Sequence, residues 1–234
     1  MTLPRRPALH AEEILLARLL DGHYPPGTAL PAERELAAEL GVTRPTLREA
    51  LQRLARDGLL DIRQGKPTLA CDPREGGLSV LAHLAARGRL NGLIPDLLDL
   101  RAALLPHWTA AAVACPAAAA ELADLLAEVP REREDDAAVW ASFDWRVQSA
   151  VARLSGNALA PMLLGSFRGV FAAAGAVYFA SPECRARSRR YYAELRGAAR
   201  RGDADEAAHL AREVAADSLN LWQQAQEGEK ASRG

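Results

Sequence analysis

Basic and hydroxyl side chains are concentrated between residues 44 and 66 of this 234-residue chain. Six basic residues stand against Glu49, Asp57 and Asp61, so six positive minus three negative charges leave a local +3 in a chain of net charge −1. The six are Arg44, Arg48, Arg53, Arg56, Arg63 and Lys66. Arginine donates to guanine O6 and N7, lysine adds a point charge for phosphate, and threonine reaches phosphate or a thymine methyl. These residue types predict a surface that binds nucleic acid.

A pair of short helices would position these donors. The apolar residues Leu47, Ala50, Leu51 and Leu54 recur at i, i+3, i+4 and i+7, which predicts the buried face of a helix. Thr43 can cap the start of this helix, and Gly41 can end a shorter helix that runs from about residue 31 to 40. A further helix is expected from about residue 9 to 22. The pattern predicts a helix-turn-helix, whose second helix places its first side chains in the major groove.

Two short strands are expected to follow. Residues 60–63 alternate between apolar and polar, residues 64–67 supply a turn, and residues 68–70 return. This arrangement predicts a two-stranded wing tipped by Gly65 and Lys66. Glycine permits the backbone to approach DNA closely, and lysine contributes charge for phosphate.

The block PPGTALPAERELAAELGVTRPTLREALQRLARDGLLDIRQGKPT resembles the winged-helix signature of the GntR family of transcription regulators. The resemblance implies a homodimer that binds a palindromic double-stranded DNA operator. It implies operator contacts in the helices and the wing at Arg34, Thr43, Arg44, Pro45, Thr46, Arg48, Gln64, Gly65 and Lys66. Within the family the block is most similar to the FadR branch, which has a hydroxyl residue in place of Pro45 and a histidine in place of Gln64. Operator preference is therefore expected to differ somewhat.

The remaining two thirds of the chain carry helical signals and no strand signals. Helices are expected at residues 78–88, 93–113, 117–129, 135–154, 157–177, 183–201 and 203–227. We predict a mainly α protein, in which the N-terminal winged helix-turn-helix precedes a C-terminal all-α antiparallel helical bundle that can enclose a ligand. The expected domains are a winged helix at 1–71, a linker at 72–77, an effector domain at 78–228 and a disordered tail at 229–234.

Many GntR regulators bind a divalent metal in the helical domain through one Asp and three His. Here Asp144 stands at the position of the metal-binding Asp, but Gln148, Tyr191 or Tyr192, and Val214 stand roughly at the others. The five histidines are dispersed along the chain. Because a site without imidazoles suits zinc poorly, we expect no metal and no cofactor.

Several stretches of the helical half resemble the FadR branch, which lacks this metal and binds a long-chain acyl-CoA. They are LLDLR ending at Arg101, FDW around Asp144, SGN at 155–157, VYFASPE around Tyr178 and AADSLNLW ending at Trp222. The resemblance implies ligand contacts at Arg101, Tyr178, Arg212, Ala215, Asp217, Ser218 and Trp222. Ala215 replaces a glycine and Asp217 a longer acid of the branch. Leu97, Leu98, Phe143 and Phe171 are candidates for lining an acyl tunnel, with core packing as the alternative.

The sequence argues against other classes of protein. No apolar run approaches the ~20 residues of a membrane span, and the acidic N-terminal stretch does not read as a signal peptide. Three cysteines without metal-ligand spacing are expected to be reduced thiols in the bacterial cytoplasm. No nucleophile–base pair or phosphate loop stands out, so an enzyme is not expected.

Taken together, the resemblance implies an acyl-CoA-responsive repressor of fatty-acid degradation genes, with activation of unsaturated fatty-acid synthesis left open. A GntR regulator that responds to another small metabolite, such as an organic acid, remains the alternative. An enzyme of acyl-CoA metabolism is a more distant one.

Overall fold

The computed structural model describes residues 7–77, 80, 93–131 and 134–232. The helix expected at residues 78–88 lies outside the described residues, apart from Val80. The chain divides into two compact units, residues 1–83 and 84–234.

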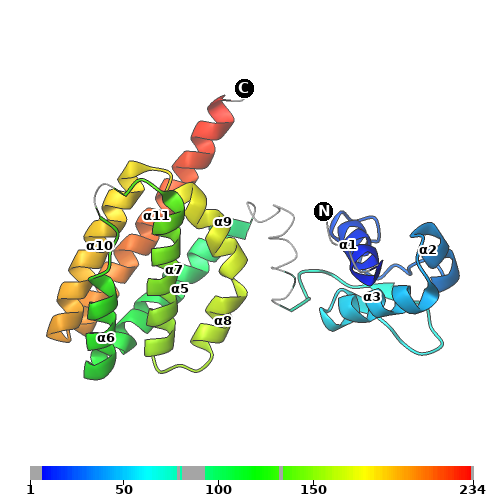
Figure 1. Ribbon diagram of the computed structural model, residues 1–234, viewed down its shortest axis with the longest axis horizontal. Helices are drawn as coiled ribbons and strands as arrows, with labels where there is room; N and C mark the ends of the chain where they lie inside the picture. The colour runs from blue at the N-terminus through cyan, green and yellow to red at the C-terminus, as the bar shows by residue number, and fades with distance from the viewer. Residues whose placement is uncertain (1–6, 78–79, 81–92, 132–133, 233–234) are drawn as a thin grey trace. The chain divides into compact units, whose positions relative to one another are not determined.

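Over its described residues, the N-terminal unit contains three helices and a two-stranded sheet (Figure 1). The elements are α1 (Pro7–Leu20), α2 (Glu33–Glu39), α3 (Arg44–Arg56), β1 (Leu60–Asp61) and β2 (Leu69–Ala70). The strands are antiparallel, with Leu60 opposite Ala70. Helix α3 packs against both α1 and α2. This is the winged helix-turn-helix that the apolar spacing and the turn residues predicted.

Helix α3 begins and buries its face as expected. Thr43 is the N-cap, and its side chain accepts a hydrogen bond from the backbone N–H of Thr46 at 3.4 Å. The four apolar positions at i, i+3, i+4 and i+7 are all buried. Burying a leucine side chain contributes about 1.5–3 kcal/mol, so this face anchors the helix while its other face stays in solvent. Gly41 has a φ of +66°, which permits the sharp turn between α2 and α3.

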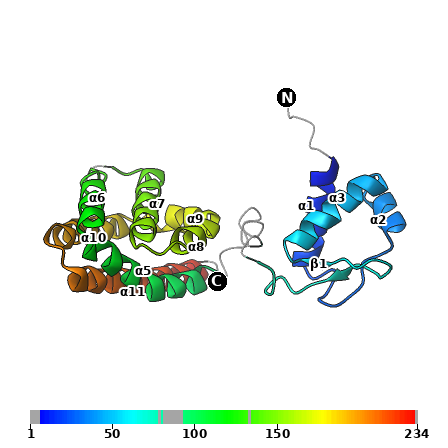
Figure 2. The same ribbon diagram turned by 90° about the horizontal axis from the view of Figure 1, so that it is seen from below.

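The C-terminal unit is a helical bundle. Its described helices are α5 (Ile94–Ala114), α6 (Pro116–Leu126), α7 (Ala137–Leu154), α8 (Ala160–Ser166), α9 (Arg168–Tyr178), α10 (Pro182–Arg201) and α11 (Ala204–Ser232). Helices α5 and α11 lie side by side along one side of the bundle (Figure 2). Helix α10 packs against both α6 and α11, and α7 packs against α9.

The main core of this unit lies among α5, α6, α7, α10 and α11. Trp140 is fully buried and stacks on Phe179, with ring centroids 5.9 Å apart. Phe143 meets Tyr192 edge to face at 5.2 Å. A second, smaller apolar cluster joins Ile94 and Leu97 of α5, Val170 of α9 and Trp222 of α11.

Two expectations about the helical half were wrong. The single helix expected at 157–177 is two helices, α8 and α9, which meet at Phe167. Gly165 and Ser166 are poor helix formers, and the break lets Phe167 pack against the smaller apolar cluster. Helix α11 continues to Ser232 through residues expected to be a disordered tail. Glutamate, lysine and alanine between residues 229 and 231 favour this continuation.

Among the described residues, no single helix is long and apolar enough to cross a membrane. Two bent pairs, α5 with α6 and α8 with α9, meet that test of length and composition only when each pair is taken together.

Candidate functional site

The exposed face of α3 carries the predicted DNA-contacting donors. Thr43, Arg44, Pro45 and Arg48 are exposed, and Thr46 is half-buried. The hydroxyls of Thr43 and Thr46 lie 2.8 Å apart and share a hydrogen bond. The first turn of this helix therefore presents hydroxyl and guanidinium groups to solvent, as a recognition helix does.

One carboxylate of α2 contacts two of these arginines. Arg48 Nε donates to Glu33 Oε2 at 2.7 Å, and Arg44 Nη2 lies 3.8 Å from the same oxygen. The arginine side chains remain 61% and 59% exposed, so their terminal nitrogens are available to a partner. Arg34, the neighbour of Glu33 on α2, is also exposed.

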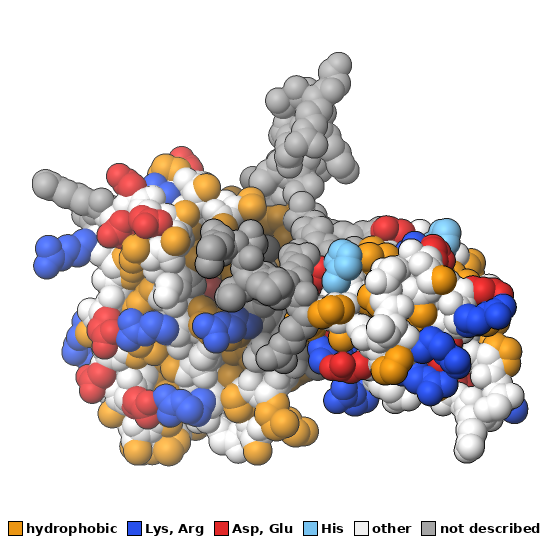
Figure 3. All heavy atoms as spheres, turned by 45° about the vertical axis from the view of Figure 1, so that its right-hand side comes forward, with side chains coloured by type: hydrophobic (Ala, Val, Ile, Leu, Met, Phe, Trp, Pro, Cys, Tyr) orange, Lys and Arg blue, Asp and Glu red, His pale blue; other side chains and the backbone are white. Residues whose placement is uncertain are grey.

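The wing residues occupy the turn between β1 and β2. Gln64, Gly65 and Lys66 are all exposed, and Gly65 has a φ of +72°. The backbone N–H of Lys66 donates to Arg63 O at 3.1 Å, which closes the turn. Lysine and arginine side chains alternate with acidic ones on the face of the N-terminal unit seen in Figure 3.

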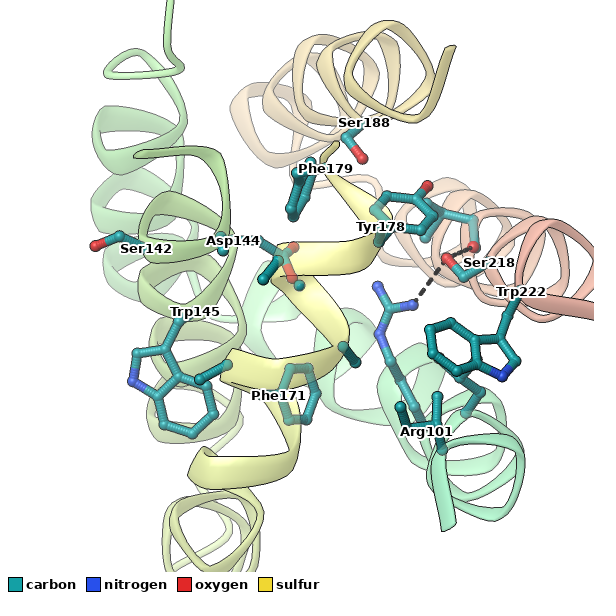
Figure 4. A pocket seen from close by; sticks show the side chains of 18 of the residues that line it. Arg101, Ser142, Asp144, Trp145, Phe171, Tyr178, Phe179, Ser188, Ser218 and Trp222 are labelled. Atoms are coloured by element: carbon teal, nitrogen blue, oxygen red, sulfur yellow. Dashed lines mark hydrogen bonds between the residues drawn. The ribbon is translucent and has the colours of Figure 1, made fainter. Parts of the chain in front are cut away.

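The helical bundle contains a cavity of about 370 Å³. Its wall is mostly apolar and includes Leu98 and Phe171, two of the four candidates for tunnel lining. The wall also includes four residues predicted to contact acyl-CoA, which come from three different helices: Arg101, Tyr178, Ser218 and Trp222. In Figure 4 Arg101 extends between Tyr178 and Trp222 toward Ser218. The fold thus brings these four together, while their role in ligand binding stays a prediction.

Arg101 is the main cationic group between α5 and α11 at this wall. Its Nη1 donates to Ser218 Oγ at 3.1 Å, and Ser218 Oγ in turn donates to Val214 O at 2.7 Å. Arg101 Nε is buried and has no hydrogen-bond partner among the described residues. A buried guanidinium donor without an acceptor is costly, so this site favours a ligand that carries an acceptor oxygen.

A second polar group lies on the cavity wall around Asp144. Tyr192 Oη donates to Asp144 Oδ1 at 2.8 Å, and Gln148 Nε2 donates to the same oxygen at 3.3 Å. Burial raises the pKa of Tyr191 to about 12, and burial together with the charge of Asp144 raises the pKa of Tyr192 well above its usual value. These phenols therefore stay neutral at physiological pH.

By the family resemblance, Asp144 and Gln148 were expected to stand where many GntR regulators bind a metal. In the part of the chain that the structure describes, no group of three His, Cys, Asp or Glu side chains could hold a metal ion. The hydrogen bonds of Asp144 instead go to a phenol and an amide of the protein itself.

Three of the predicted ligand contacts lie outside the cavity wall. Ala215 is fully buried in α11, and Arg212 is exposed. Asp217 accepts a hydrogen bond from Arg187 Nε of α10, which ties the two helices together. A direct role of these residues in binding stays a prediction.

Sequence reasoning assigned no ligand contact to the face of α10 that reaches the cavity. Ser188, Tyr191 and Tyr192 line the wall and stand at i, i+3 and i+4. This spacing places three polar side chains on one helical face. It is the sequence pattern from which a polar face on this helix could have been predicted. Of the other tunnel candidates, Leu97 belongs to the smaller apolar cluster and Phe143 to the main core.

Comparisons with known proteins cover nearly the whole chain. Residues 7–69 match the family described as bacterial regulatory proteins, gntR family, and residues 74–230 match the FadR C-terminal domain. A fatty acid metabolism regulator protein of Shewanella pealeana is 37% identical over 224 residues, 93% of this chain and 91% of the relative. One from Klebsiella pneumoniae is 36% identical over 223 residues, 94% of this chain and 92% of the relative.

A solved structure of Lar, described as controlling the expression of the Listeria monocytogenes agr system, matches with a TM-score of 0.57 at 19% identity. The match covers 95% of this chain and 99% of that one, and at this identity it shows the shared fold alone. Two family models match in tandem, and relatives above 30% identity cover nine tenths of the chain. These matches agree on the family. The chain belongs to the GntR family of transcription regulators and, within it, to the fatty acid metabolism regulators with a FadR C-terminal domain.

Proposed function

We propose that the chain binds a palindromic DNA operator as a homodimer and that a long-chain acyl-CoA in the bundle cavity releases it from that operator. The genes under control would be those of fatty-acid degradation, which the protein represses until acyl-CoA accumulates. Activation of the genes of unsaturated fatty-acid synthesis would be a second regulatory outcome of the same operator binding. The observation that carries the proposal is the cavity, in which apolar side chains surround one under-satisfied arginine.

The composition of the cavity wall suits an acyl thioester. Leu98, Phe171 and Trp222 offer apolar surface, and each buried methylene of a fatty tail contributes ~0.8 kcal/mol. Arg101 offers a donor for a carbonyl oxygen. The volume of about 370 Å³ falls in the range of roughly 300–1,000 Å³ of small-molecule sites. These features favour a long apolar ligand with one acceptor group.

The exposed arginines and threonines of α3 support the DNA-binding half of the proposal. Two identical helices related by a two-fold axis would read two half-sites of a palindrome. The acyl-CoA and the operator are then linked reciprocally, because each ligand must lower the affinity for the other by the same factor. The protein would work in the cytoplasm, where operator DNA and acyl-CoA are both present.

The decisive experiment is a DNA titration of the full chain with and without acyl-CoA. An operator is first selected from a pool of random duplexes, and its affinity is measured by fluorescence anisotropy at fixed ionic strength. Acyl-CoAs of increasing chain length are then added, with free CoA as the control. We expect operator affinity to fall only with the long-chain thioesters. Unchanged operator affinity at saturating oleoyl-CoA would contradict the proposal.

A calorimetric titration without DNA separates the two halves. Acyl-CoA binding that leaves operator affinity unchanged would contradict the coupling but not the binding. If a panel of organic acids stabilises the bundle against heat and acyl-CoA does not, the effector belongs to a different chemical class. Hydrolysis of the thioester during these titrations would indicate an enzyme.

A further inference from the structure

We propose that Glu33 is a specificity-determining residue, which holds the guanidinium of Arg48 in the orientation that reads one base pair. The inference rests on the proposed DNA binding and concerns a residue of α2 outside the predicted set of contacts. It begins from the 2.7 Å hydrogen bond between Arg48 Nε and Glu33 Oε2, which joins the first residue of α2 to the second turn of α3.

This ion pair contributes little to stability. The Arg48 side chain is 61% exposed and the Glu33 side chain 32% exposed. Exposed pairs of this kind contribute about 0–1 kcal/mol at most, because water and salt screen them. The core of the N-terminal unit also holds α2 against α3 through apolar side chains such as Leu36 and Leu47. The function of the ion pair is therefore to be found in its effect on the orientation of the Arg48 side chain and not in stability.

The geometry leaves the reading edge of Arg48 free. Guanidinium has five N–H donors in a planar fork. Nε is the nitrogen that donates to Glu33, and neither terminal nitrogen makes a hydrogen bond with a described residue, so both remain for guanine O6 and N7. A long side chain loses rotamer freedom when it docks, and a hydrogen bond already present in the free protein reduces that loss.

The negative charge of Glu33 adds discrimination. A carboxylate close to both Arg48 and Arg44 weakens the attraction of these side chains to any phosphate, which is the part of DNA binding that carries no sequence information. The same charge weakens the contact between Arg48 and a base less, because that contact consists of directional hydrogen bonds. Glu33 is expected to lower non-specific affinity while it preserves the contact with the correct base.

A matched control lies two residues further along the same helix. Glu35 is exposed, and its side chain makes no hydrogen bond or ion pair within the part of the chain that the structure describes. Glu35→Ala therefore removes the same charge from the same turn without releasing an arginine. Glu33→Gln keeps an acceptor oxygen for Arg48 Nε and removes only the charge.

The test measures discrimination at single base pairs. Wild type and Arg48→Ala are titrated against the selected operator and its single-base variants, and the pair that only the wild type distinguishes is the one that Arg48 reads. We expect Glu33→Ala to lose about tenfold in discrimination at that pair and little at others, a loss within the range of one bidentate base contact. Glu33→Gln should keep part of the wild-type discrimination at that pair, and Glu35→Ala should keep all of it.

A double variant completes the test. In an Arg48→Ala background, Glu33→Ala should cause no further loss at that base pair, because its effect acts through the arginine. Equal changes for Glu33→Ala and Glu35→Ala on every duplex would overturn the inference and leave the proposed function standing. A wild-type chain with no preference for any duplex over a scrambled one would instead remove the proposed function. Circular dichroism of each variant checks that the fold is intact.

Discussion

At the scale of single residues, arginine serves both candidate sites in opposite surroundings. Arg48 lies on a solvent-exposed helix face, where its charge is screened and it pairs with one carboxylate. Arg101 lies against a largely apolar cavity, with one hydrogen bond to Ser218 and a buried Nε without a partner among the described residues. The exposed position of Arg48 suits a guanidinium that replaces its bound water with the edges of DNA bases. The position of Arg101 suits a guanidinium that donates a hydrogen bond to an acceptor atom of a ligand.

Removing the guanidinium of Arg48 should weaken sequence-specific binding. A bidentate base contact discriminates by about 1–3 kcal/mol, so Arg48→Ala is expected to weaken operator binding by roughly 5- to 150-fold and acyl-CoA binding not at all. Arg56→Ala is the matched control, because Arg56 lies in the last turn of α3, away from the end that enters the groove. Gel shifts and calorimetry measure the two affinities. Normal operator binding by Arg48→Ala would refute the assignment of this helix face.

Removing the guanidinium of Arg101 should weaken ligand binding. Hydrogen bonds to charged groups contribute about 1.5–3 kcal/mol, so Arg101→Met is expected to lower acyl-CoA affinity by roughly 10- to 150-fold while operator affinity without ligand is unchanged. Arg196→Met is the control, since Arg196 lies on α10 outside the cavity wall and also has a buried Nε without a partner among the described residues. Equal loss in both variants would indicate a general effect on the bundle.

At the scale of elements, a glycine follows each of the two helices of the helix-turn-helix. Gly41 follows α2 and Gly58 follows α3, and both have positive φ, +66° and +76°. They differ in their surroundings. A Cβ on Gly41 would meet open space, whereas a Cβ on Gly58 would lie 3.1 Å from the Cα of Gly76 in the predicted linker. Gly58 therefore serves both the turn and the close approach of a second backbone segment.

This difference predicts two unequal substitutions. Gly41→Ala should destabilise the N-terminal unit by about 1 kcal/mol, the cost of a left-handed conformation for an L-residue. Gly58→Ala should cost more, because the backbone of the linker must also move. Scanning calorimetry or far-ultraviolet circular dichroism can follow the unit, and 1 kcal/mol corresponds to about 4–8 °C in Tm for a domain of this size. Equal shifts would contradict the close packing of Gly76 on Gly58.

Helix α10 shows how one element can serve two environments. Ser188, Tyr191 and Tyr192 face the cavity. On other faces Arg189 lies over the Trp140 ring at 5.0 Å, and Arg187 pairs with Asp217 of α11. The helix is therefore held by cationic contacts at its sides, while a phenolic face completes the cavity wall.

At the scale of the whole molecule, the cavity exists because five of the described helices meet around it. Its wall draws on α5, α7, α9, α10 and α11. No single helix carries the site, so a ligand bound there would act on the packing of these five helices. Such a site is suited to a regulator, because the ligand can change the relative stability of two arrangements of the bundle.

The buried phenols predict a loss of stability at high pH. At a pH well below about 10, the usual pKa of tyrosine, the phenol is protonated in both the folded and the unfolded chain. Because burial raises the pKa of Tyr191 to about 12 in the folded protein, the unfolded chain ionises first as the pH rises from 10 toward 12. Stability should fall through this window, by up to ~3 kcal/mol for this one group.

Tyr191→Phe should flatten that loss. All four tryptophans lie in the C-terminal unit, so their fluorescence follows urea unfolding of this unit alone. The difference in unfolding free energy between Tyr191→Phe and the wild type should shift in favour of the variant from pH 8 to pH 11.5. A difference that stays constant over this range would show that the phenol is accessible to solvent in the folded state.

The sequence by itself determined the local parts of this protein. The apolar spacing of residues 47–54, the Thr43 cap and the Gly41 turn each act over a few residues, so their outcome follows from short-range chemistry. The winged helix, its exposed donors and most helices of the bundle could be predicted for this reason. The family could be assigned because its motifs are contiguous in the chain.

Tertiary structure alone decided which residues share a site. Arg101 and Ser218 are 117 positions apart, and Glu33 and Arg48 are 15 apart, yet each pair makes a hydrogen bond. The break between α8 and α9 at Phe167 also depends on tertiary structure. Gly165 and Ser166 only weaken the helix there, and Phe167 packs against an apolar cluster whose residues are distant in the sequence. Side-chain contacts between helices depend on how the helices pack, and no spacing within one helix encodes them.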